Sequence, residues 1–167
     1  MNTDFSLDHS RFSHIAGDAV RVDYSTGLIS NSSFVDINQN GWATNGSKVS
    51  AEQLFFNNIG QQGIVAREAS QLTVRWVDVR QADIGIAATG QSTLKLSDAL
   101  LEKNNIGVSI YEEDPNAGTS YINAERLEVQ NTETPYKIEP KAKMVLDGAP
   151  LGKEKKGIVE KIKKVLQ

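Results

Sequence analysis

The sequence predicts an all-β solenoid, a single-stranded parallel β-helix of about six to seven coils, and three observations support this prediction. Small residues recur every 22 positions, apolar side chains alternate in short runs after them, and like residues fall into columns at the same spacing. A fixed repeat of this size indicates one supersecondary unit per repeat, stacked on its neighbours.

The repeat is marked by a small residue with an apolar residue directly after it. The markers are Ala19, Gly41, Gly63, Gly85 and Gly107, and the residues after them are Val20, Trp42, Ile64, Ile86 and Val108. A second column holds Phe12, Phe34 and Phe56, and a third holds Ile15, Ile37 and Ile59. Parallel coils lie about 4.8 Å apart, so we expect the three phenylalanines to stack ring on ring inside the solenoid.

One insertion and two slips interrupt the repeat. The segment "EEDPNAG" (112–118) delays the next marker, and six extra residues place it at Pro135. We expect this segment to loop out while the coils on either side keep their contacts. The inward residues also slip by one position near Val49 and again near Val77.

Within each coil the apolar pattern has the period of two that is typical of strands. Three short alternating runs per coil are separated by Asn, Gly, Ser and Asp corners. A leucine-rich repeat has a similar repeat length, but it needs a leucine framework and a helical half, and neither is present. The β-helix is therefore the better prediction.

The amino-acid composition limits the class of protein and the kinds of site it can contain. The 167 residues are 39% hydrophobic and 23% charged, which fits one soluble domain. The absence of cysteine excludes disulfides and thiolate metal sites. The formal charge of −3 divides into six Lys and two Glu from Lys153 onward and 12 basic against 19 acidic residues before it. Such an acidic body does not suit nucleic acid, which is bound through Lys and Arg contacts to phosphate.

The two ends of the predicted solenoid differ. We expect residues 1–151 to form the coils and residues 152–167 to form an amphipathic C-terminal helix that caps them. Its apolar residues at helical spacing are Ile158, Val159, Ile162, Val165 and Leu166. The alternative is that its lysine-rich face contacts a membrane surface or an acidic partner. The N-terminal end has no such cap, so we expect either an upstream domain of a longer chain or a second chain there.

The segments "NNIGQQGIV", "ADIGIAA" and "KNNIGVSIY", with the S-x-L corners in "ASQLTV" and "QSTLKL", resemble the right-handed parallel β-helix repeat proteins. That group includes pectate lyases, polygalacturonases and alginate epimerases. The resemblance covers residues 5 to about 148 and implies a right-handed solenoid. More narrowly, "KNNIGVSIYEEDPNAGTSYINAERLEV" and "APLGKEKK" are similar to the C-terminal β-helix region of bacterial CotH-like (spore-coat-kinase-like) proteins, which implies an upstream domain and a bacterial, extracytoplasmic or cell-surface location.

Ligand grooves in carbohydrate-active β-helices run along outward positions of adjacent coils, so the candidate ligand residues are those four positions past each marker. This row holds Asp23, Asn45, Arg67, Thr89, Tyr111 and Glu139. We take Asp23, Asn45, Arg67, Tyr111 and Glu139 as the ligand-binding candidates. The row lacks the clustered aspartates of glycoside hydrolases, and Asp23 and Glu139 are five coils apart, too far for paired catalysis.

Other polar residues receive structural interpretations. We expect surface roles for His9 and His14, and a solvated ion-pair network for Arg75, Asp78, Arg80 and Asp83. Glu112, Glu113 and Asp114 carry carboxylates that calcium would accept, but an acidic loop is the simpler interpretation. The sequence therefore predicts no catalytic residue, metal or cofactor.

Three functions follow from these patterns. The first is a noncatalytic module that binds a polysaccharide or a protein surface as part of a larger bacterial protein. The second is a fragment of a carbohydrate-active enzyme, a lyase or epimerase whose catalytic residues lie upstream. The third is a structural spacer or assembly element joined through its open N-terminal end. The first accounts best for a repeated polar exterior without paired acids.

Overall fold

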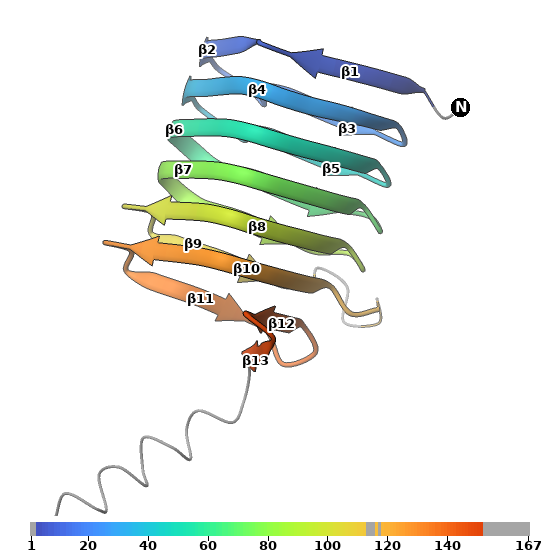
Figure 1. Ribbon diagram of the computed structural model, residues 1–167, viewed down its shortest axis with the longest axis vertical. Coiled ribbons are helices and arrows are strands. Elements are labelled where there is room, and N and C mark those ends of the chain that lie inside the picture. Colours follow the sequence, from blue (N-terminus) through green and yellow to red (C-terminus); the bar gives the residue numbers. More distant parts are fainter. Residues whose placement is uncertain (1–2, 113–115, 117, 152–167) are drawn as a thin grey trace, which may run out of the picture.

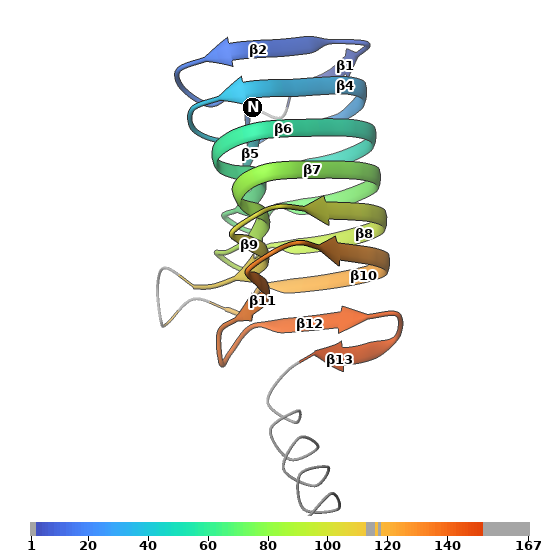
Figure 2. The same cartoon turned by 90° about the vertical axis from the view of Figure 1, so that its left-hand side faces the viewer.

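The computed structural model describes residues 3–112, 116 and 118–151, which form a β-solenoid of about six turns (Figures 1 and 2). The strands are β1 (Asp4–Asp8), β2 (Arg11–Ile15), β3 (Val20–Asp23), β4 (Thr26–Ile37), β5 (Trp42–Asn45), β6 (Lys48–Arg67), β7 (Gln71–Ala88), β8 (Thr93–Glu102), β9 (Ile106–Ile110), β10 (Tyr121–Gln130), β11 (Thr134–Ile138), β12 (Lys143–Leu146) and β13 (Ala149–Leu151). No helix occurs among these described residues.

Each coil contributes to three faces of the solenoid. The first face holds β1, the opening residues of β4, β6, β7, β8 and β10, and then β12 and β13. The second face begins at β2 and continues through later residues of the same long strands. The third face holds β3, β5, the ends of β6 and β7, β9 and β11. All pairs are parallel except β12 with β13.

The predicted repeat length is confirmed by the register of the strands. Phe12 pairs with Phe34 and Phe34 with Phe56, which are steps of 22 residues. The slip near Val49 is confirmed, because Val49 pairs with Leu72 at a step of 23. Thr93 pairs with Tyr121 at a step of 28, which confirms that six residues are inserted between these coils. Part of the inserted segment itself lies outside the described residues.

The core is a stack of columns that runs along the solenoid axis. The rings of Phe12 and Phe34 are 5.2 Å apart between centroids, and those of Phe34 and Phe56 are 4.4 Å apart; both pairs are stacked. Phe34, Phe56 and Trp42 are fully buried, whereas Phe12 in the first coil is only partly buried. The predicted phenylalanine column is therefore confirmed.

The corners are made by single residues in the left-handed backbone region. One corner column holds His9, Asn31, Gln53, Trp76, Asp98, Arg126 and Asp147, and another holds His14, Asp36, Asn58, Gln81, Lys103 and Asn131, all with φ between 48° and 58°. Asn and Asp tolerate this conformation best, and a bulky residue such as Trp76 adopts it rarely. The predicted Asn, Gly, Ser and Asp corners are thus only part of the observed set.

Side chains form further rungs between coils. The backbone N–H groups of Ser25, Ser47, Ser70 and Ser92 donate to the hydroxyls of Ser47, Ser70, Ser92 and Ser120, each one coil further on, at 3.1–3.2 Å. Four Asp–Asn pairs, Asp18–Asn40, Asp23–Asn45, Asp36–Asn58 and Asp83–Asn105, link carboxylate to amide exactly one repeat apart. These rungs satisfy polar groups where the chain turns and cannot pair as a strand.

The marker glycines occupy positions where the backbones of adjacent coils come close. A Cβ on Gly63 would lie 2.6 Å from the carbonyl oxygen of Gly85 and 2.5 Å from Cγ1 of Val79. A Cβ on Gly85 would likewise lie 2.7 Å from the carbonyl oxygen of Gly107. The recurrence of a small residue at this position therefore has a steric cause.

The C-terminal end of the first face is covered by a hairpin. β13 pairs antiparallel with β12, with Leu151 opposite Met144 (Figure 2). The expected capping helix over 152–167 lies outside the described residues, so the observed cover is this hairpin. At the other end the first coil has no cover among the described residues.

Phe56 and Phe55 test the inward and outward faces of one strand. Phe56 is 0% exposed and stacked, and Phe55 beside it is 37% exposed. Phe56→Ala removes a buried ring and should lower the free energy of unfolding by about 3–5 kcal/mol. Phe55→Ala should change it by about 0.5 kcal/mol or less. Urea denaturation measures both, and equal losses would contradict the orientation of Phe56.

Gly63→Ala tests the close approach of coils at the marker. The added Cβ meets backbone and a core side chain, so we expect a loss of about 1–3 kcal/mol in the free energy of unfolding. Gly17→Ala is the matched control, because a Cβ there meets nothing within 4 Å. Thermal unfolding of both variants checks this expectation, which a neutral Gly63→Ala would refute.

Candidate functional site

The candidate ligand residues lie in one row on the third face. Asp23, Asn45 and Arg67 are direct register partners on β3, β5 and β6. The row continues through Thr89 and Tyr111 to Glu139. The backbone N–H groups of these three residues donate to the carbonyl oxygens of Ala66, Ala88 and Ile110, respectively, on the preceding coils. The structure therefore brings the sequence-predicted residues into one line, although Asp23 and Glu139 lie at opposite ends of it.

The middle of the row is less exposed than the sequence indicated. Asn45 is 4% exposed and Thr89 is 1% exposed. Beside them, Ala43, Val65 and Ala87 form a small apolar cluster that is separate from the core, and Ile84 and Tyr111 pack against it. Asn45 and Thr89, which the sequence places at outward positions of the row, are therefore buried.

Three long polar side chains on this face are joined by hydrogen bonds. Nε2 of Gln62 donates to the hydroxyl of Tyr111 at 3.3 Å, and Nη2 of Arg67 donates to Oε1 of Gln62 at 3.3 Å. We call Gln62, Arg67, Thr89 and Tyr111, with the apolar floor of Ala43, Val65 and Ala87, the third-face patch. It presents an aromatic ring, a guanidinium and an amide beside a floor of small side chains.

Two polar atoms of the patch are buried without a hydrogen-bond partner among the described residues. They are Nε of Arg67 and Oγ1 of Thr89, which belong to adjacent positions of the row. Leaving a buried donor or acceptor unsatisfied costs about 1–3 kcal/mol. These two atoms therefore carry an energetic cost that a hydrogen bond to each would relieve.

The carboxylates near the patch are already engaged by backbone groups. Glu112 accepts hydrogen bonds from the N–H groups of Gly90 at 3.0 Å and Ser120 at 2.7 Å. Glu139 accepts one from the N–H of Glu112 at 3.0 Å. Both carboxylates therefore accept hydrogen bonds from backbone N–H groups that would otherwise have no partner beside the inserted segment. Glu113 and Asp114 lie outside the described residues.

Asp23 begins the row at the N-terminal end. Its carboxylate accepts hydrogen bonds from the amide of Asn45 and from Nε of Arg21, the latter at 3.1 Å. The Asn45 hydrogen bond is the main cause that holds the pKa of Asp23 below its ordinary value of 3.8, and Arg21 adds to it. Asp23 is therefore a charged acceptor at neutral pH.

The charged cluster predicted around Arg75 divides into separate pairs. Arg80 pairs with Asp78 at 2.7 Å and with Glu102 at 3.4 Å, whereas Arg75 faces Asp98 at 3.7 Å. Asp83 takes no part in these pairs and instead accepts from Asn105. The ion-pair interpretation is confirmed for the two arginines, and the inclusion of Asp83 in that network is wrong.

The histidines stand apart from the patch on the first coil. His9 bonds Asp8 at 2.7 Å, and His14 faces Asp36 at 3.4 Å. Both side chains are largely exposed. Among the described residues, no group of three or more His, Asp or Glu is placed to hold a metal ion.

Sequence reasoning missed Gln62 and Ile84, which complete the patch. Each comes directly before a marker glycine, and the register shifts between Ile59 and Gln62. This irregularity breaks the period of two, so a count back from Ile64 does not place Gln62 on the outer side. The available signal was the polar residue directly before each of the first three markers, Asp18, Asn40 and Gln62.

Four hollows lie away from the patch. One is at each end of the solenoid, with volumes of about 320 Å³ beside Phe5 and about 580 Å³ beside Met144. Two polar hollows lie at corners, one of about 410 Å³ near Asp83 and one of about 230 Å³ near Tyr24. No segment of the described chain forms a helix long and apolar enough to cross a membrane.

Parallel coils and columned core residues define a β-helix repeat module. The family model described as right-handed beta helix region matches residues 1–131, and the chain belongs to this family. The solenoid is accordingly a right-handed parallel β-helix. No curated protein and no solved structure matches the chain.

Acid should weaken the fold through its low-pKa aspartates. Hydrogen bonds hold the pKa values of Asp8, Asp23 and Asp98 below 3.8, chiefly from Ser30, Asn45 and Arg126 respectively. A depressed folded-state pKa gives stability that is complete above the unfolded value and is lost as pH falls below it. We expect the melting temperature to hold at neutral pH and to fall below pH 3.8.

The matched variant for this titration is Asp98→Asn. It removes the ion pairs with Arg126 and Arg75 and should melt lower at neutral pH, with a smaller further decline in acid. Melting curves of both proteins across the pH range provide the measurement. An identical acid decline in the variant would show that Asp98 does not contribute to it.

Proposed function

We propose that this chain is a noncatalytic β-helix module that binds a polysaccharide along its third face. The observation that carries the proposal is the pair of buried, unpartnered polar atoms on Arg67 and Thr89 beside the Tyr111 ring. Sugar rings present hydroxyl groups around an apolar face. Such a ligand supplies acceptors and donors to Arg67 and Thr89 while its C–H face packs on Tyr111.

The repeat of the row favours a polymer. Successive positions from Asp23 to Glu139 are separated by about one coil height of 4.8 Å, so polar side chains recur along the solenoid axis. Asn45 and Thr89 are buried, whereas Asp23, Arg67, Tyr111 and Glu139 keep exposed surface. An extended polysaccharide crosses several coils and gains contacts from these exposed members of the row.

The carboxylates support binding over catalysis. Glycoside hydrolysis by paired carboxylic acids needs two such groups roughly 5–10 Å apart on either side of the scissile bond. Glu112 and Glu139 accept backbone N–H groups, and Asp23 is held by Asn45 and Arg21. Each of these acids therefore has a structural task. A lyase or epimerase fragment is the alternative function, and a structural spacer is the third.

The wider setting of the module rests on the amino-acid sequence alone. An upstream domain in a larger bacterial protein, a cell-surface location and contact of the lysine-rich 152–167 segment with an acidic partner or membrane stay predictions. They place the module where polysaccharides are met, and binding on the third face does not depend on them.

Arg67→Ala tests the proposed binding. Affinity electrophoresis of the full chain against neutral and uronate-containing polysaccharides should show retardation, and the variant should bind about tenfold more weakly, the effect of losing one charged hydrogen bond. Tyr111→Ala should act in the same direction. Arg75→Ala is the control, because Arg75 is an exposed arginine on the first face.

Three outcomes would overturn the proposal. The first is no retardation by any polysaccharide tested, which would favour a protein ligand or a spacer. The second is an equal loss in Arg75→Ala, which would indicate attraction by charge alone. The third is release of unsaturated or shortened products from the polysaccharide, which would establish the enzyme alternative.

A further inference from the structure

The N-terminal end of the solenoid presents three strands with an open edge. In the described part of the chain, β1 and β2 pair only with β4, and β3 pairs only with β5 (Figure 1). One edge of each strand therefore has backbone groups without a strand partner. Open edges of this kind recruit further strands unless something covers them.

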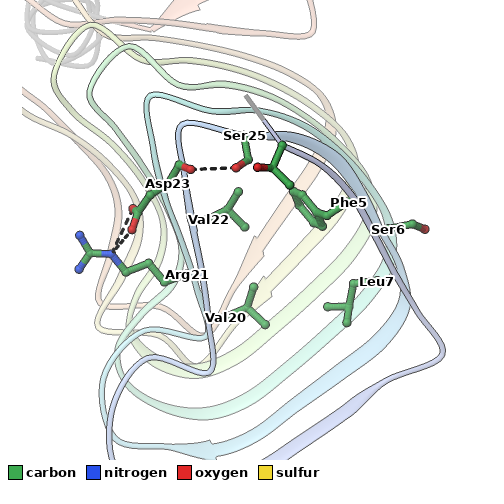
Figure 3. A pocket seen from close by; sticks show the side chains of 9 residues that line it. Phe5, Ser6, Leu7, Val20, Arg21, Val22, Asp23 and Ser25 are labelled. Carbon is green, nitrogen blue, oxygen red and sulfur yellow. Dashed lines mark hydrogen bonds and ion pairs between the residues drawn. The ribbon is translucent and has the colours of Figure 1, made fainter. Parts of the chain in front are cut away.

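An apolar interior lies open beside these edges. Phe5, Leu7, Val20 and Val22 point into a hollow of about 320 Å³, while Arg21 and Ser6 point away from it (Figure 3). Phe12 stacks on Phe34 on one side only, at 5.2 Å, and no third ring continues the column beyond it among the described residues. The end therefore combines unpaired backbone with uncovered core side chains.

The C-terminal end does not offer the same surface. There β13 runs antiparallel along β12 and covers the edge of the first face. Copies of the chain consequently cannot stack end to end into a continuous solenoid across that face. Association through the N-terminal end instead closes after two molecules, as a two-fold interface does.

We propose that the N-terminal end is the interface of a head-to-head dimer, with a second copy seated on β1, β2 and β3. A two-fold axis across the solenoid reverses the strand direction, so strands meet in antiparallel pairs and apolar interior meets apolar interior. The first coil spans residues 3–25, which matches the roughly 20–30 residues per side of a standard interface.

The charges of this end suit a self-complementary contact. Asp4 and Arg11 are exposed charges of opposite sign on the first coil, so a two-fold contact has opposite charges to bring together, and Arg21 is already paired with Asp23. The carboxylates of Asp8 and Asp18 are bonded to Ser30 and Asn40 of the next coil. They are therefore turned away from the open edge, which reduces repulsion between two copies.

Light scattering and small-angle X-ray scattering of the full chain test the proposal. We expect a mass of twice 18.3 kDa that falls to one chain on dilution, and a long axis about double that of one solenoid of stacked 4.8 Å coils. A monomer at every concentration would overturn it, because the end would then be left open or covered by another occupant. A dimer with an unchanged long axis would overturn it as well.

Two adjacent substitutions locate the interface. Leu7→Lys places a charge in the open hollow and should shift the protein to monomer, whereas Ser6→Lys on the outer side of the same strand should leave the dimer intact. Equal behaviour of the two would contradict the proposal. If Leu7→Lys does not fold, hydrogen exchange of the unaltered chain tests the proposal instead. The backbone amides of β1–β3 should exchange more slowly as the protein concentration rises.

Discussion

Parallel pairing between successive coils is the constraint on which the rest of this structure depends. It holds each residue about 4.8 Å from the residue one repeat later, so identical side chains become neighbours. Phe12, Phe34 and Phe56 stack, serine hydroxyls accept backbone N–H groups of the preceding coil, and aspartates meet asparagines, all for this one reason. The same spacing forbids a side chain at Gly63, because the next coil's carbonyl occupies the space.

The parts of the fold that repeat in identity were predictable from the sequence. Each of these features is a spacing between residues in the sequence, and the strand register has the same spacing. They are the phenylalanine column, the marker glycines, the slip near Val49 and the six-residue insertion. The left-handed corners were less predictable, because Trp76, Lys103 and Arg126 adopt a conformation that their residue types do not favour. The β13 hairpin was not predictable, since it belongs to no repeat.

In the candidate site, too, the repeating positions were predictable from the sequence, and the residues that surround them were not. Counting four residues from each marker placed Asp23, Asn45, Arg67, Tyr111 and Glu139 on one line, which the strand register reproduces. Counting could not show that Asn45 is buried, because a spacing gives the side of the strand on which a residue lies and not what packs over it. It also could not include Gln62, whose hydrogen bonds to Arg67 and Tyr111 depend on an irregularity beside Gly63.

The ligand row and the open end meet at one place, around Arg21 and Asp23. Both residues line the rim of the N-terminal hollow, and Asp23 is also the first member of the third-face row. Arg67 is two register steps further along the axis, so the third-face patch stays clear of a copy seated on the first coil. Contacts along the third face recur with every coil, whereas a contact at the N-terminal end forms once. The solenoid can therefore separate ligand binding along its length from association with a second copy at its end.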